Sequence, residues 1–352
     1  MTGDLRADGV DPSSGDAASV AMTGYGVYVP DDVVTGEAIA AESGIPEEVV
    51  VEKMGVREKH VCPPDGDHVT DMCVAAAEDA LADADVDPAE LDAVLYHGSE
   101  YKDHVVWSAA ANVAERIGAD GAFASESYAL CAGAPIAFRQ ARAQLVADAP
   151  ETMLLVAASR EEDLVDYGNE ASSFMFNFGS GASAVVLERD PADPLATVRE
   201  SAAVTDGSFS EDVVMPAGGS KQPPSHATVE AGLHTLDVPD PEGMKERLAD
   251  TSIENFLHVA DVALDRSGHE RDDLDFVALT HVKRSFHDLL LDELDATGYY
   301  LDEFGHVQSV DQALALDRGR ELGRVDPGDL VLFLAAGTGY TWAATVLEWH
   351  GR

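Results

Sequence analysis

One cysteine of this 352-residue chain stands where a protein could activate a nucleophile. Cys131 lies in the segment YALCAGAPIAF, in which a predicted strand runs into the thiol, small residues flank it and a helix begins just after it. A thiol at a helix N-terminus meets the positive end of the helix dipole, which favours the reactive thiolate. The small neighbours leave room for a substrate carbonyl and leave the backbone N–H of Cys131 free as an oxyanion donor. The same pattern also fits a buried cysteine that fills space between a helix and a sheet.

Two histidines are candidate partners of that thiol. His281 follows the apolar run DFVALT, at the carboxyl end of a predicted strand, where open α/β sheets bind their ligands. His306 lies in FGHVQSVDQALAL, after a turn and before a predicted helix. Each of them also fits a structural histidine at the end of an element. His287, six residues past His281 and inside a predicted helix, is expected to be structural.

An acid and a glycine turn complete the candidate chemistry. Glu100, in YHGSEYKDH, ends another predicted strand and could act as a general acid/base, although a solvated surface acid is the ordinary alternative. The turn at Gly337–Thr338–Gly339, in AAGTGYTW, has neither pattern of a phosphate-binding loop. We expect it to aim a backbone N–H at a carbonyl oxygen. Cys62 and Cys73 are expected to be structural, and three scattered cysteines predict no disulfide framework and no metal site.

The elements that must position these residues alternate between strand and helix in both halves of the chain, which predicts an α/β fold. A glycine turn precedes an apolar strand twice, in FGSGASAVVLE and in AGTGYTWAATVLEW, which indicates an internal duplication. We therefore predict an N-terminal half at 20–193 and a C-terminal half at 194–352, after a flexible acidic tail at 1–19. The polar stretch at 207–239 is expected to run over the surface, and a helix is predicted in ENFLHVADVALDRSG.

Charge excludes several classes of function. Asp and Glu number 66 and Lys and Arg 22, a formal net charge of −44 that repels nucleic acid and anionic membranes. The acids are spread along the chain, as expected for a protein of a halophilic host, where salt shortens the Debye length to about 3 Å. An ordinary acidic protein is the alternative. The chain has no apolar run of about 18 residues and no basic signal sequence, so we expect a cytoplasmic protein.

Taken in order, these segments resemble the thiolase superfamily, most closely its β-ketoacyl-ACP synthase III branch. The likeness rests on MGVREKHV, ESYALCAGAPIAF, FNFGSGASAVVLE, LTHVKRSFHDLLLDEL and, almost throughout, FGHVQSVDQALALDRGRELGRVDPGDLVLFLAAGTGYTWAATVLEW. It extends from about residue 22 to the end. The resemblance implies a five-layered αβαβα fold made of two duplicated halves, and a homodimer.

The resemblance also implies roles. Cys131 would take an acyl group from acyl-CoA as a thioester. His281 and His306 would bind the carbonyl of a malonyl thioester, on CoA or on a carrier protein, and stabilise the enolate that forms as CO₂ leaves. The backbone N–H groups of Cys131 and of Gly337–Thr338–Gly339 would form the oxyanion hole. No cofactor or metal is implied. Because the negative net charge opposes an anionic CoA, we hypothesise in addition that Lys53, Arg57, Lys283 and Arg284 form a basic rim that binds it.

The chain departs from the family pattern at both candidate histidines, and near Ser172 it lacks an arginine that the family has before its first glycine-led strand. The family has Asn where this chain has His306, although a neutral histidine can also donate an N–H. Its HQAN motif is here His281–Val282–Lys283–Arg284. The altered position leaves open an acyltransferase that does not decarboxylate. HGSEYKD is similar to a segment of 3-hydroxy-3-methylglutaryl-CoA synthases, which would make Glu100, Cys131 and His281 a triad for an aldol-type reaction. A catalytically silent scaffold that binds a partner enzyme is the third alternative.

Overall fold

A computed structural model describes residues 18–147 and 150–351, and within them one order of elements occurs twice. Each half has a first strand, an excursion, three alternations of helix and strand, and a final strand that turns back beside the previous one. The elements of the first half are β1 (Val20–Tyr28), β2 (Val33–Thr35), α1 (Gly36–Ser43), β3 (Glu58–His60), α2 (Val69–Ala84), β4 (Ala93–Tyr96), α3 (Ala109–Ile117), β5 (Phe123–Glu126), α4 (Gly133–Ala147), β6 (Thr152–Ser159) and β7 (Gly181–Arg189). Those of the second are β8 (Ala196–Thr205), α5 (His226–Glu230), α6 (Pro241–Ser267), β9 (Phe276–Leu279), α7 (Arg284–Leu294), β10 (Thr297–Gly298), α8 (Asp311–Glu321), β11 (Leu330–Gly337) and β12 (Thr341–Trp349).

The sheet repeats in the same way. Its strand order is β10-β9-β11-β12-β8-β1-β7-β6-β4-β5, and β2 and β3 form a separate small sheet. Each half therefore contributes five strands to the large sheet. Numbered along the chain within their half, these five lie in the order third, second, fourth, fifth, first, from the outer edge to the middle. In each half the second strand is parallel to the third and the fourth, and the other pairs are antiparallel. The halves join where Ala21 pairs with Thr197 and Met22 with Ala196. This mixed sheet confirms the predicted α/β class and the duplication.

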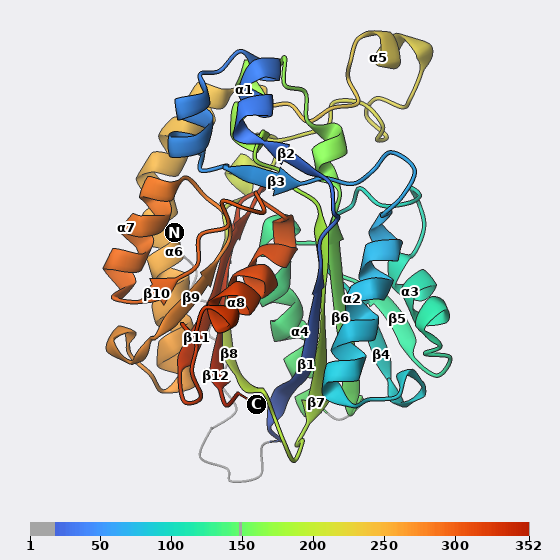
Figure 1. The fold of residues 1–352 in the computed structure, drawn as a ribbon, viewed down its shortest axis with the longest axis vertical. Helices are drawn as coiled ribbons and strands as arrows, with labels where there is room; N and C mark the ends of the chain where they lie inside the picture. Colours follow the sequence, from blue (N-terminus) through green and yellow to red (C-terminus); the bar gives the residue numbers. More distant parts are fainter. Residues whose placement is uncertain (1–17, 148–149, 352) are drawn as a thin grey trace.

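Helices separate and cover the two sets of strands, as Figure 1 shows. α2 and α3 lie against the first set, α6 and α7 against the second, and α4 and α8 lie in the middle layer. Glycines allow one close approach, because a Cβ at Gly24 or Gly26 of β1 would lie 2.5 Å from the carbonyl of Ala80 or 2.4 Å from that of Ala76 in α2. The result is the expected five-layered αβαβα fold.

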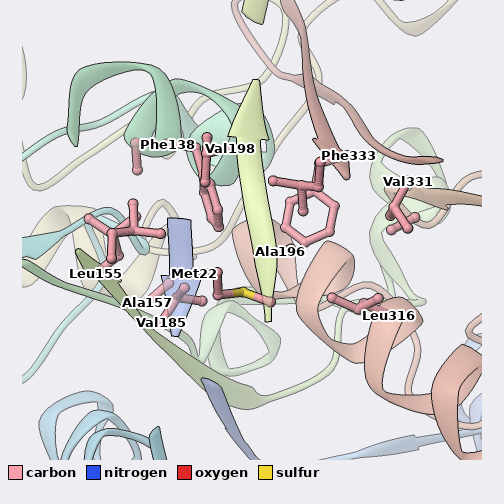
Figure 2. Close-up of a cluster of buried hydrophobic side chains, with 14 of the residues drawn as sticks. Met22, Phe138, Leu155, Ala157, Val185, Ala196, Val198, Leu316, Val331 and Phe333 are labelled. Atoms are coloured by element: carbon pink, nitrogen blue, oxygen red, sulfur yellow. The ribbon is translucent and has the colours of Figure 1, made fainter. Parts of the chain in front are cut away.

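The largest core fills the middle layer, with side chains from both halves (Figure 2). Met22 of β1 and Leu155 of β6 meet it from the first half, and Leu316 of α8 from the second. Phe138 of α4 packs edge to face on Phe333 of β11, with ring centroids 5.4 Å apart. Burial of such side chains contributes about 1.5–3 kcal/mol each. The two helices that carry the candidate site are therefore held by one shared core.

The structure corrects one predicted boundary. α6 begins at Pro241, after the N-cap Asp240, and not at Glu254 as the apolar pattern predicted. The added turns, PEGMKERLADTS, are rich in charge and hide the helical period, but tertiary contacts of Met244 hold them. The predicted excursion at 207–239 contains α5 and projects at the top of Figure 1.

Some expectations lie beyond what the structure tests. Residues 1–17 of the predicted tail fall outside the described residues, and the boundary between the halves at 193 and 194 stays a prediction, although β7 ends and β8 begins on either side of it. Among the described residues, every helix is too short or too polar to cross a membrane.

Candidate active site

A cavity of about 540 Å³ lies where the two halves meet. Cys131 lines it from the first half, and His281 and His306 line it from the second. Most of its remaining wall is apolar. The large apolar side chains that line it are Met54, Phe174, Phe178, Met244, Leu248, Phe256, Val282, Phe286 and Tyr340. The structure thus brings together the three side chains that the sequence singled out, and surrounds them with a mostly apolar wall.

The backbone presents Cys131 at the start of a helix. The thiol lies in the short helical turn Leu130–Ala132, which leads directly into α4, so the predicted helix start is confirmed. Leu130 has a φ of +50°, a conformation that non-glycine residues adopt only where the surroundings hold it. A Cβ on Gly337 would lie 2.4 Å from the carbonyl of Ala129, so glycine is needed for β11 to approach this turn. The side chain is only 5% exposed.

His306 contacts the thiol directly. Its Nε2 lies 3.1 Å from Sγ of Cys131, and its Nδ1 lies 2.6 Å from Oδ2 of Asp311. The backbone N–H of His306 donates to the carbonyl of Asn177 at 2.7 Å, and the ring meets Phe178 edge-on at 5.2 Å. Cys131, His306 and Asp311 therefore form a continuous row of polar contacts.

Asp311 is the group that ties the two histidine segments together. It is the first residue of α8 and is fully buried. Besides His306, Oδ2 accepts the backbone N–H of His281 at 2.7 Å and the hydroxyl of Thr280 at 3.1 Å. Oδ1 accepts the backbone N–H of Val307 at 2.7 Å. One carboxylate thus positions both candidate histidines.

The two histidines differ in charge. Burial lowers the pKa of His281 to about 4, so its ring is neutral at pH 7. Burial opposes the charge of His306 as well, but the Asp311 carboxylate and the Cys131 sulfur outweigh it and raise the pKa of His306 well above its usual value. A carboxylate against Nδ1 favours the charged ring over the neutral donor predicted from the sequence, and the donor role of His306 stays a prediction.

Both ring nitrogens of His281 contact other groups of the protein. Its Nδ1 lies 3.0 Å from Nδ2 of Asn177, and its Nε2 lies 3.2 Å from the carbonyl of Gly55. Because the Gly55 oxygen only accepts, Nε2 carries the proton and Nδ1 accepts from the asparagine.

A second polar side chain reaches the thiol. Oε1 of Gln308 lies 2.6 Å from Sγ of Cys131. Gln308 opens the turn before α8 and has a φ of +56°. A carboxamide presents an acceptor on one side and donors on the other, so this residue can serve a thiol with its oxygen or a thiolate with its NH₂.

The predicted oxyanion turn lies against the nucleophile. A Cβ on Gly337 would be 3.1 Å from the backbone N of Cys131, and Thr338 lines the cavity. Gly339 has a φ of +128°, which favours glycine. The donor role of these N–H groups stays a prediction.

The acid predicted from the sequence does not line the cavity. Glu100 is exposed and is not among the residues that line the cavity, whereas Glu161 is buried and its charge interacts with that of His306. Burial raises the pKa of Glu161, and the hydroxyl of Ser159 donates to it at 2.5 Å. A carboxyl near the site therefore exists, but it is a different one.

Of the four predicted rim residues, Lys283 lines the cavity and Lys53 is exposed. Arg57 forms an ion pair with Glu303. Arg284 pairs with Asp302 at 2.9 Å and stacks on Tyr300. Lys245 of α6, which the sequence analysis did not single out, also lines the cavity. The CoA-binding role of the rim stays a prediction.

Asp311, Gln308 and Asn177 were missed by the sequence analysis. Asp311 stands in the run SVDQALAL, and an acid at a helix start is ordinarily a solvated first-turn residue. The one available signal was its spacing, five residues after His306 and at the head of a predicted helix. Side-chain contacts across 100 residues or more, such as Asn177 with His281, leave no local pattern.

Two family models match the chain. The 3-oxoacyl-[acyl-carrier-protein (ACP)] synthase III model matches residues 126–207, which include Cys131. The model of the C terminal of 3-oxoacyl-[acyl-carrier-protein (ACP)] synthase III matches residues 264–349, which include both candidate histidines and Asp311.

Relatives match over almost the whole length. A beta-ketoacyl-[acyl-carrier-protein] synthase III of Desulfitobacterium hafniense is 28% identical over 338 residues, which cover 95% of this chain and 99% of the relative. The crystal structure of the priming beta-ketosynthase from the R1128 polyketide biosynthetic pathway superposes with a TM-score of 0.82 at 24% identity, over 96% of this chain and 98% of that one. That of 3-oxoacyl-[acyl-carrier-protein] synthase III from Aquifex aeolicus VF5 gives 0.80 at 21%, over 94% and 100%.

The duplicated αβαβα fold, with a cysteine and two histidines in one cavity between its halves, is thiolase-like. With the two family models and the curated relatives, it defines an enzyme of the thiolase-like condensing class. Within this class the chain is β-ketoacyl-ACP synthase III-like.

Proposed function

We propose that the protein transfers an acyl group from acyl-CoA to Cys131 and then condenses it with a malonyl thioester, with loss of CO₂. The observation that supports this proposal most strongly is the contact of Cys131 with His306 at the edge of a 540 Å³ apolar cavity. The thiol is buried from water but lines a space that can hold an acyl chain. Such a site favours a thioester over its hydrolysis.

In the first half-reaction the sulfur of Cys131 attacks the thioester carbonyl, and the bond from that carbon to the CoA sulfur breaks. The Cys131 N–H and the Gly337–Thr338–Gly339 turn are the proposed donors to the tetrahedral oxyanion. Each such donor contributes about 3–4 kcal/mol by analogy with other oxyanion holes. Lys283 and Lys245 at the cavity are suited to the phosphates of the incoming thioester.

In the second half-reaction the malonyl thioester enters the same cavity. Loss of CO₂ leaves an enolate whose oxygen needs donors, and we propose Nε2 of His281 and of His306 for that task. The enolate carbon attacks the acyl carbonyl, and Cys131 leaves as a thiolate. His281 is pre-set for this role because its Nε2 already carries a proton.

We propose that the enzyme is a homodimer. Five of its exposed large apolar side chains lie in or near the edge strand β5 in sequence or through one ion pair. Phe123 lies in β5 and Tyr128 follows it, and Tyr101, Val105 and Val106 belong to the segment whose Lys102 pairs with Glu126 of β5. An exposed apolar patch on a sheet edge is typical of an interface. Light scattering coupled to gel filtration should give twice the 37.2 kDa chain mass, and Val105→Asp with Val106→Asp should give the single mass. A cytoplasmic location and a role in fatty acid biosynthesis are part of the same proposal.

Intact mass spectrometry tests the proposed reaction. The protein is incubated with a panel of acyl-CoAs and then with malonyl-CoA or a malonyl carrier protein. We expect an acyl adduct on Cys131 that disappears, with release of CO₂, when the malonyl thioester is added. An adduct that persists in the presence of both extenders would refute condensation.

Acyl transfer without decarboxylation is the second candidate, and the Asp311–His306 contact favours it. With a carboxylate at Nδ1, an uncharged His306 turns a lone pair towards the thioester and can act as a base for a hydroxyl, amine or thiol acceptor. Transfer of the adduct to such an acceptor would distinguish the two. The exposed position of Glu100 removes the main support for a hydroxymethylglutaryl-CoA-type reaction, and failure of every acyl-CoA to label Cys131 would favour the scaffold.

A further inference from the structure

We propose that Asp311 is a positioning residue that fixes the proton of His306 on Nδ1, so that His306 meets Cys131 as an imidazolium beside a thiolate. Once its Nε2 proton has left, it meets the acyl group as a base. The use made of the thiolate rests on the proposed function, but the state of the pair does not.

The geometry around Asp311 leaves its carboxylate only as an acceptor. Oδ2 receives Nδ1 of His306, the backbone N–H of His281 and the hydroxyl of Thr280, and Oδ1 receives the backbone N–H of Val307. Two of these donors are backbone groups of the segments that carry the histidines, so the carboxylate cannot turn away from His306 without losing them. Its side chain is fully buried, so water does not compete.

That arrangement determines the forms open to His306. With a carboxylate 2.6 Å from Nδ1, this nitrogen keeps its proton. Nε2, 3.1 Å from Sγ, then either carries the second proton and donates to the sulfur or is a bare acceptor. A neutral ring with its N–H on Nε2, the form that would mimic an asparagine amide, is excluded by Asp311.

The charges around the ring favour the protonated form. Asp311 on α8 and the sulfur of Cys131 raise the pKa of His306. Glu161, from the turn after β6, also interacts with His306, and the neutral ring of His281 faces it from the end of β9. The carboxamide of Gln308 on the other side of the sulfur can turn its NH₂ to a thiolate.

The proton balance of acylation follows. The thiolate of Cys131 forms the new bond to the acyl carbon, and the bond to the CoA sulfur breaks. The proton on Nε2 of His306 passes to the departing CoA thiolate, which leaves as free CoA. Decarboxylation and condensation release a Cys131 thiolate but no proton, so His306 regains one proton from water in each cycle. It does so before CO₂ leaves, and its Nε2–H can then donate to the enolate oxygen.

The pH dependence of alkylation tests the pair without any thioester. The rate of iodoacetamide labelling at Cys131 is measured by peptide mass spectrometry between pH 5.5 and 9. We expect the wild-type rate to change by less than about threefold between pH 6 and 8, because a paired thiolate persists at low pH. In Asp311→Asn the rate at pH 6 should fall at least about 30-fold below that at pH 8, as for an ordinary thiol.

Asp317→Asn is the matched control. Asp317 lies in the same helix and hydrogen-bonds the hydroxyl of Tyr25 at 2.8 Å, away from the cavity lining. Its profile should match that of the wild type. Cys62 and Cys73 are buried, and burial raises the pKa of the Cys62 thiol to about 11, so neither should contribute at these pH values. Superimposable profiles for wild type and Asp311→Asn would overturn the proposal.

A measurement on the wild-type protein covers the case in which Asp311→Asn does not fold. In protein labelled with ¹⁵N-histidine, the His306 signals, assigned with His306→Asn, should show both ring nitrogens protonated at pH 7. A neutral ring protonated on Nε2 would overturn the proposal. If Cys131 accepts no acyl group from any acyl-CoA while these results hold, the proposed function fails and the role of Asp311 stands.

Discussion

The two helices of the middle layer, α4 and α8, hold equivalent places in the two halves but carry different chemistry. α4 follows β5 and α8 follows β10, which are equivalent strands of the two halves. Each helix is preceded by a three-residue helical turn, Leu130–Ala132 or Gln308–Val310. The first residue of each turn has a positive φ, +50° for Leu130 and +56° for Gln308. The backbone device is therefore the same, and the side chains that it presents are not.

The difference is clearest at the second residue of each turn. In the first half this residue is Cys131, whose sulfur meets His306 and Gln308 across the halves. In the second half it is Ser309, whose hydroxyl donates to the carbonyl of His97 at 3.0 Å. Duplication thus places two helix N-termini next to each other, and the halves then divide the work: the first holds the nucleophile and the second holds the histidine–carboxylate pair that faces it.

The largest expected effect comes from substitution of Cys131, and its matched comparison is Ser309, the equivalent residue of the other turn. Cys131→Ala should abolish the acyl adduct and lower product formation at least about 10³-fold, since no other cysteine of the described chain lines the cavity. Ser309→Ala should keep most of the activity and cost about 1 kcal/mol of stability through its lost hydrogen bond. Intact mass and thermal unfolding measure the two. Product formation by Cys131→Ala would contradict the assignment of the nucleophile.

His306→Asn separates the two tasks given to the second half. The amide can still donate to an enolate but cannot form an ion pair with the thiolate. We expect acylation at pH 6 to fall about 10²-fold, and malonyl decarboxylation by pre-acylated enzyme to fall less. Single-turnover mass spectrometry follows each step. Equal losses in both steps would show that His306 has one role and not two.

A smaller effect compares a buried histidine from each half. Burial lowers the pKa of both His97 and His281 to about 4, so each binds a proton on unfolding below pH 6.5 but not in the folded state. The free energy of unfolding is therefore fully retained above pH 6.5 and decreases as the pH falls to 4, by about 1–3 kcal/mol per histidine. His306, with its raised pKa, titrates outside this window.

His97→Asn and His281→Asn should each flatten this loss, as measured by denaturant unfolding between pH 4.5 and 7. The first should leave both half-reactions largely intact, because His97 does not line the cavity, and the second should slow decarboxylation of the malonyl thioester, for which we propose His281 as a donor. An unchanged slope in both variants would contradict the neutral state of these rings.

Salt should act on the halves alike. The net charge of −44 is spread along the chain, so screening should relieve repulsion in both halves. We expect a single unfolding transition whose midpoint rises by about 5 °C between 0.1 and 2 M KCl. The halophilic origin is a prediction from composition alone, and a midpoint that falls with KCl would refute it.

Local patterns were sufficient for much of the fold. Buried strands such as TMLLVAAS are continuous apolar runs, as is typical of central strands in covered sheets. The small residues after Cys131 indicated the helix that follows it. The start of α6 was missed because its first turns are highly charged and are held by Met244 against the cavity wall. Hydrophobic periodicity indicates which face of a helix is buried. It does not predict a helical segment that only a few tertiary contacts hold in place.

The sequence by itself determined the fold class, the duplication, the helix start at Cys131 and the identity of the three central side chains, because each of these leaves a short-range pattern or a motif. Only the tertiary structure decided that Glu100 is exposed, that His281 faces Gly55 and that His306 is backed by Asp311. The charge of a buried ring depends on neighbours that the fold brings from distant segments. The protonation of this site therefore depends on tertiary packing, and no local segment of the sequence predicts it.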